Sequence, residues 1–123
     1  MTHFNAIDPE TVRLIQASGP SEELLNVVAE TFQALSDLTR LKILYALLKS
    51  EVCVRDLAIL IGVSESAISH QLRILRDRRL VTQRRKGNVI YYSFHDNHLA
   101  ALFREAEYHA DHVYQNIANH PYP

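Results

Sequence analysis

A short turn between two amphipathic helices limits most strongly what this chain can fold into. A predicted helix over about 54–61 ends at Gly62-Val63-Ser64, and a second helix follows that we expect to reach about Arg79. The turn contains a glycine, and Ser64 is a typical N-cap residue. Two helices joined by three or four residues that include glycine are typical of a helix-turn-helix. The sequence therefore predicts this motif in the middle of the chain.

Further helices surround the motif. Apolar residues at helical spacing predict core helices over about 21–35 and 37–49, and a long helix over about 97–119. Residues 1–20 contain two prolines and a glycine with space for one short helix between them, so we expect an N-terminal arm. Residues 21–123 then form the main domain.

Two β-prone segments follow the motif, at 80–85 and 89–94. They surround Lys86-Gly87-Asn88, a turn suited to a β-hairpin. A hairpin directly after a helix-turn-helix corresponds to the wing of a winged helix. We therefore expect a mainly α fold with a small β-hairpin, a winged helix-turn-helix.

Composition excludes several other classes of protein. With 123 residues, of which 47% are hydrophobic and 22% charged, the chain can bury a core and does not resemble a disordered segment. It has neither an apolar run long enough to cross a membrane nor an export signal, so we expect a cytoplasmic protein without a membrane partner. The single cysteine excludes an internal disulfide and a two-thiolate site within one chain.

The charged residues are distributed unevenly, although the net charge is only −1. Seven of the thirteen basic residues fall between positions 72 and 86, where Asp77 is the one acid. Five of the seven histidines lie in the last quarter of the chain. Because the basic cluster coincides with the second helix of the motif and the hairpin, it favours double-stranded DNA as the partner. A merely solvated basic face is the alternative.

The DNA hypothesis assigns roles to particular side chains. Short polar or forked side chains near the start of a helix can read bases in the major groove. The candidates are Ser64, Glu65, Ser66, Ser69, His70 and Gln71. Basic side chains would bind phosphates, which position a protein without specifying sequence. The candidates are Arg73, Arg76, Arg84, Arg85 and Lys86.

Three segments resemble one known family at its own spacing. They are residues 35–44 (LSDLTRLKIL), 51–57 (EVCVRDL) and 62–72 (GVSESAISHQL). Over about residues 20–115 the chain resembles ArsR/SmtB-type metal-sensing repressors. The resemblance implies a homodimer, joined through its terminal helices, that binds operator DNA when metal-free and leaves it when metal binds.

The resemblance also implies a metal site on the last helix, over about 96–119. Four residues match the ligands of the zinc sensors of this family, namely Asp96, His98, His109 and His112. Other members bind metal through a Cys-x-Cys pair. Here the first position is Cys53 but the second is Arg55, so that thiolate site is incomplete. A related site would combine Cys53 and Asp56 with His3 from the arm. Alternatively, Cys53 is a small buried thiol and Asp56 a surface acid.

Helix geometry bears independently on the C-terminal site. The three histidines share one helix face, but His98 and His109 are eleven residues apart, which is about 16 Å along the axis. One chain therefore cannot close the site, whereas two antiparallel helices can. A heptad-like apolar seam supports such pairing: Leu99, Phe103, Ala106, Ala110, Val113 and Ile117. The alternatives are that Asp96 is only an N-cap and that the histidines are polar surface.

Three imidazole nitrogens and one carboxylate oxygen suit Zn(II), with Co(II) as a close mimic. Ni(II) would need more ligands, for which His3, His120 and the terminal amine are candidates. Four protein ligands leave no open coordination position and no separate general base stands out, so we expect neither an enzyme nor an organic substrate. The remaining alternatives are a Ni(II)/Co(II) sensor and a winged-helix regulator that senses no metal.

Overall fold

The computed structural model describes residues 5–115, and the chain divides into two compact units, 1–30 and 31–123. The first unit contains α1 (Pro9–Ser18) and the larger part of α2 (Glu22–Leu35). In α1, the Asp8 carboxylate accepts hydrogen bonds from the amide and hydroxyl of Thr11, at 3.1 and 2.8 Å. The short helix expected within the arm is therefore present, and its own N-cap begins it.

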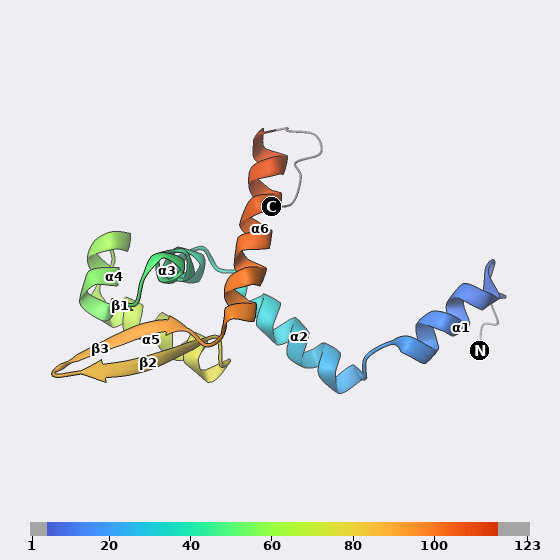
Figure 1. Ribbon diagram of the computed structural model, residues 1–123, viewed down its shortest axis with the longest axis horizontal. Coiled ribbons are helices and arrows are strands. Elements are labelled where there is room, and N and C mark those ends of the chain that lie inside the picture. The colour runs from blue at the N-terminus through green and yellow to red at the C-terminus, as the bar shows by residue number, and fades with distance from the viewer. Residues whose placement is uncertain (1–4, 116–123) are drawn as a thin grey trace. The chain divides into compact units, whose positions relative to one another are not determined.

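The second unit contains the helix-turn-helix (Figure 1). After α3 (Leu38–Lys49), helix α4 (Val54–Ile61) ends at Gly62, whose φ of 82° is left-handed and suits glycine. Helix α5 (Glu65–Asp77) begins where the Ser64 hydroxyl accepts a hydrogen bond from the Ala67 amide at 3.0 Å. The predicted turn and cap are confirmed.

Helix α5 ends earlier than the sequence predicts. It stops at Asp77, because Arg79 adopts φ of 58° and turns the chain toward the sheet. The Leu80 amide then donates to the Leu75 carbonyl at 2.9 Å, a closing bond typical of helix C-termini.

The hairpin consists of β2 (Val81–Lys86) and β3 (Val89–Phe94). Its pairing runs from Val81 opposite Phe94 to Lys86 opposite Val89, with Gly87 at φ of 64° in the turn. A third strand, β1 (Val52–Cys53), pairs with the other edge of β3, so the sheet order is β1-β3-β2. The sequence did not predict β1. The predicted winged helix-turn-helix is otherwise confirmed.

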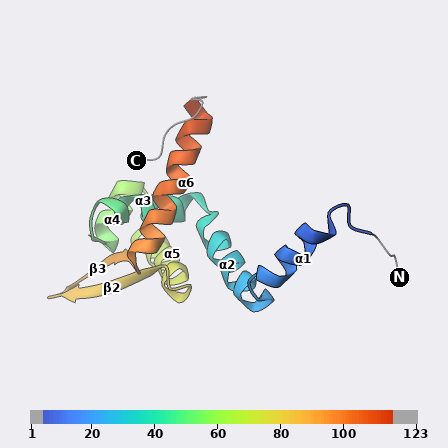
Figure 2. The ribbon, with the colours of Figure 1, turned by 45° about the vertical axis from the view of Figure 1, so that its right-hand side comes forward.

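The hydrophobic core of this unit lies between the sheet and helices α3, α4 and α5. Its fully buried side chains are Ile43, Leu44, Leu57, Ile68, Leu72, Leu75 and Val81. Helix α6 (Asn97–Gln115) packs against this core through its first half only, and its second half projects beyond the other elements of the unit (Figures 1 and 2). Positions 116–119 of the predicted helix lie outside the described residues. Within residues 5–115, none of the helices has the length and apolar character of a membrane span.

Two neighbouring residues of α4 test the position of the core. Leu57 is fully buried and Ile59 is 74% exposed. We expect Leu57→Ala to lower the free energy of unfolding by about 2–5 kcal/mol, because it leaves a cavity. The matched control Ile59→Ala should change it by less than about 0.5 kcal/mol. Urea unfolding at a fixed protein concentration measures the free energy of unfolding of both variants. An equal decrease in the two would contradict the position of the core.

Candidate functional site

Helix α5 presents a polar face opposite its buried one. Ile68, Leu72 and Leu75 point into the core. The exposed side chains include most of the predicted base-reading and phosphate-binding residues: Ser64, Glu65, Ser66, Ser69, His70, Arg73 and Arg76. The helix can therefore offer these groups to a ligand without disturbing the core.

Gln71 differs from the other predicted base-reading residues. Its side chain is half-buried, and its Oε1 accepts a hydrogen bond from Nη1 of Arg40 at 3.1 Å. Nε of Arg40 also donates to the carbonyl oxygen of Ala34 at 2.6 Å. Arg40 was not among the functional residues predicted from the sequence. Its partners are six and 31 residues away, so no local pattern indicates the contact.

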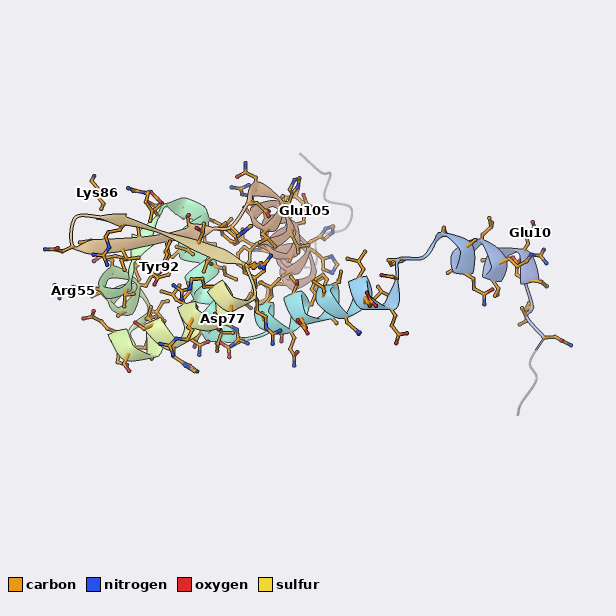
Figure 3. The ribbon with its side chains drawn as sticks, turned by 90° about the horizontal axis from the view of Figure 1, so that it is seen from below. Glu10, Arg55, Asp77, Lys86, Tyr92 and Glu105 are labelled. Atoms are coloured by element: carbon orange, nitrogen blue, oxygen red, sulfur yellow. The ribbon has the colours of Figure 1, made fainter. Side chains whose placement is uncertain are left out.

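Strand alternation separates the basic residues of the hairpin into two groups. Val81 is buried against the core, so Arg85 lies on the same, core-facing side of β2, while Arg84 and Lys86 lie on the opposite side. Figure 3 shows Lys86 and Tyr92 on opposite sides of the hairpin. A small hollow of about 140 Å³ between α5 and the sheet is lined by Ser69, Leu72, Arg73, Arg76 and Tyr92. Arg85 therefore belongs to the side of the sheet that faces α5.

Arg84 has a protein partner on its own side of the sheet. Its guanidinium makes two hydrogen bonds to the Glu51 carboxylate, at 2.8 and 3.2 Å, and lies 5.5 Å from the centre of the Tyr91 ring. The bond to Arg84 holds the pKa of Glu51 below its usual value and raises the pKa of Arg84. Glu51, which directly precedes the short strand β1, was not predicted from the sequence as a functional residue.

Asp96 caps helix α6. Its Oδ1 accepts the Leu99 amide at 3.0 Å, and its Oδ2 lies 3.4 Å from Nδ1 of His95. The bond from Leu99, followed by that from His95, holds the pKa of Asp96 below its usual value, so this carboxylate is ionised at neutral pH. The N-cap role predicted as an alternative for Asp96 is therefore confirmed, and the cap uses Oδ1.

The predicted metal ligands on α6 are not brought together within one chain. His98 and His109 are exposed and His112 is half-buried on one continuous helix, where His98 and His109 are about 16 Å apart along the axis. Among residues 5–115, no three His, Cys, Asp or Glu side chains form a group that could hold a metal ion.

The predicted apolar seam of α6 has two parts with different environments. Leu99 and Phe103 pack on the core of their own chain, and the Phe103 ring lies 6.3 Å from that of Phe94. This packing leaves both side chains only half-buried, and their pairing with a partner helix stays a prediction. Ala106, Ala110 and Val113 remain exposed, Val113 by 66%, and Ile117 lies outside the described residues.

The alternative Cys53 site is only partly described. Cys53 is half-buried, Asp56 is exposed in the first turn of α4, and both line a hollow of about 530 Å³ beside the hairpin turn. The third predicted ligand, His3, lies outside the described residues. The exposed side chain of Arg55 approaches Glu65 to 3.7 Å in the same region.

Comparison with known proteins agrees with this architecture. The family model for bacterial regulatory proteins of the arsR family matches residues 37–83. The chain is 49% identical to the transcriptional repressor SmtB homolog of Synechocystis sp., over 87% of this chain and 79% of that protein. It is 46% identical to the transcriptional regulator NmtR of Mycobacterium tuberculosis, over 76% of this chain and 79% of that one.

Two solved structures share the fold. The homodimeric winged helix-turn-helix DNA-binding domain of Mb0332 from Mycobacterium bovis superimposes with a TM-score of 0.75 at 31% identity, covering 85% of this chain and 99% of that one. The solution structure of apo-NmtR gives a TM-score of 0.67 at 43% identity, covering 85% and 89%. Helix α5, the recognition helix of the helix-turn-helix, has a polar face, and the β2–β3 hairpin, the wing, is basic. Together with these relatives, they show that the chain belongs to the arsR family of bacterial regulatory proteins and is a DNA-binding transcriptional repressor.

Proposed function

We propose that this repressor binds operator DNA as a metal-free homodimer and leaves it when Zn(II) binds between the C-terminal helices of the two chains. One observation carries the proposal: three histidines on α6 and the carboxylate that caps it are too widely separated for one chain to use them together. A second chain supplies the missing ligands when its α6 runs antiparallel. The Mb0332 domain, a structural neighbour, is homodimeric.

The exposed second half of α6 supports this pairing. Ala106, Ala110 and Val113 present an apolar strip that the chain's own core does not cover. In an antiparallel pair, Asp96 and His98 of each chain approach His109 and His112 of the other, which gives two equivalent sites. Small residues on the strip allow the helices to approach closely.

The donor set favours zinc over the metals named for some relatives. A cadmium resistance regulatory protein CadC homolog of Staphylococcus aureus is 43% identical over 67% of this chain, and the arsenical resistance operon repressor of Bacillus subtilis is 38% identical over 68%. Cadmium and arsenite prefer thiolates, and this chain has only Cys53. Three imidazoles and the ionised Asp96 match tetrahedral Zn(II), with Co(II) as its mimic. Ni(II) is the alternative if residues outside 5–115 add ligands.

DNA binding uses the exposed face of α5 in the major groove, with Arg73, Arg76 and Arg85 on phosphates. In the dimer, both recognition helices must fit successive major grooves at once. A metal bridge between the two α6 helices favours a dimer geometry that does not meet this requirement. By thermodynamic linkage, operator DNA must weaken zinc binding by the same factor.

Removing one ligand should separate metal response from DNA binding. We expect His109→Ala to bind DNA normally but to lose its release by zinc, because the substitution leaves the recognition helix unchanged. The control is Asp111→Asn, which alters a nearby acid outside the ligand set and should respond like the wild type. DNA binding by fluorescence anisotropy across Zn(II), Co(II) and Ni(II) measures the response. Zinc release that persists in His109→Ala would contradict the site.

Mixed dimers test whether the ligands come from two chains. One variant carries Asp96→Asn and His98→Ala, the other His109→Ala and His112→Ala, and neither should bind zinc tightly alone. A mixed dimer purified through two different tags retains one complete site, so we expect about one tightly bound ion per dimer. Equilibrium titration with a zinc indicator gives the stoichiometry. Ligands drawn from a single chain would give none.

The hairpin arginines should contribute unequally to DNA binding. Each phosphate contact adds about 0.9 to the slope of log affinity against log salt. We expect Arg85→Ala to reduce this slope by about 0.9 for each chain of the bound dimer. Arg84→Ala should reduce it by less than half as much, because Glu51 already holds that guanidinium. An unchanged slope in Arg85→Ala would contradict the assignment of Arg85 to a phosphate. An equal reduction of the slope in both variants would mean that Arg84 releases Glu51 and binds DNA.

A further inference from the structure

We infer that Arg40 is a positioning residue that links the end of α2 to the recognition helix α5, and that Gln71 serves this link instead of reading a base. The inference rests on the proposed DNA binding through α5. It concerns how that helix is oriented and does not add a new contact to DNA.

The Arg40 guanidinium contacts two other helices at the same time. Its Nε donates to the carbonyl oxygen of Ala34 at 2.6 Å, and its Nη1 donates to Oε1 of Gln71 at 3.1 Å. Ala34 is buried and lies one residue before the end of α2, where carbonyl groups lack partners within their own helix. The backbone of Arg40 is held at the start of α3, where its amide donates to the N-cap carboxylate of Asp37 at 3.0 Å.

The chemistry of arginine suits this bridge. Its planar guanidinium holds donors in a fixed fork, so two acceptors bonded to it keep a defined relative orientation. Lysine carries one compact ammonium on a flexible chain and cannot reproduce that geometry. The bridge also occupies the acceptor oxygen of Gln71, which a glutamine needs for paired hydrogen bonds to adenine.

The bridge lies between two functional parts of the molecule. Helix α2 ends with exposed apolar surface, including Phe32 at 54%, which is suited to an interface between chains. Helix α5 carries the exposed polar face. A dimer fits two major grooves only if each α5 keeps its orientation to the dimer interface. Arg40 contributes to that orientation because it holds the end of α2 and helix α5 together within one chain.

The test uses a DNA duplex selected by the wild-type protein from a random-sequence pool, compared with an unselected duplex. The variants are Gln71→Met, which keeps the length of the side chain but removes the acceptor, Arg40→Lys, and the two combined. We expect each single change to weaken binding to the selected duplex about five-fold, which corresponds to the typical net contribution of one hydrogen bond. The double variant should bind the selected duplex with the same affinity as whichever single variant binds it less tightly.

Two further readouts distinguish positioning from direct contact. The salt dependence should stay unchanged, because no phosphate contact is lost, and the preference at every base pair of the selected duplex should persist. Urea unfolding should show that Gln71→Met remains fully folded under the conditions of the DNA measurement, so the result does not depend on whether Arg40→Lys folds well. A lost preference at one base pair in Gln71→Met, or multiplied effects in the double variant, would overturn the link. If the wild type selects no duplex at all, the proposed function itself fails.

Discussion

The fixed rise of an α-helix, about 1.5 Å per residue, is the constraint on which the proposed regulation depends. His98 and His109 lie on one unbroken helix, whereas ligands of a single zinc ion lie within a few ångströms of each other. A site that needs both residues therefore needs two chains. Metal binding and dimer formation are then coupled by mass action, because an ion that binds only the dimer stabilises the dimer.

The different environments of the two halves of α6 give this coupling a direction. The first half is anchored to the chain's own core, where Phe103 contacts Phe94 at the end of β3. The second half is exposed and available to a partner. Under the proposed regulation, the contact between Phe103 and Phe94 would carry a rearrangement of the outer half first to the end of the hairpin, which follows α5 directly in the chain. Core packing transmits such shifts because close-packed side chains resist compression.

Local chemistry explains which features were predictable. The turn at Gly62 and the cap at Ser64 were predicted because each depends on residues within one helical turn. Strand β1 was missed, since two residues are too few to show an alternating pattern. The packing of Leu99 and Phe103 on their own core was not predicted, because apolar spacing identifies a face to be covered and does not say what covers it. The pairs Arg84–Glu51 and Arg40–Gln71 join residues 33 and 31 positions apart, beyond any local pattern.

The Arg84–Glu51 pair also changes how the basic cluster should be interpreted. The pKa of Glu51 is lowered by Arg84, so the pair contributes to stability above the ordinary pKa of a glutamate and is lost only as the pH falls through the lower, folded value. At neutral pH both groups are charged, and protons do not compete for the carboxylate. Exposed ion pairs contribute little to stability, so the main effect of Glu51 is on the charge that Arg84 offers to DNA. The count of basic residues in the sequence therefore overstates the positive charge that the free protein offers to DNA, and Glu51 accounts for one of those charges.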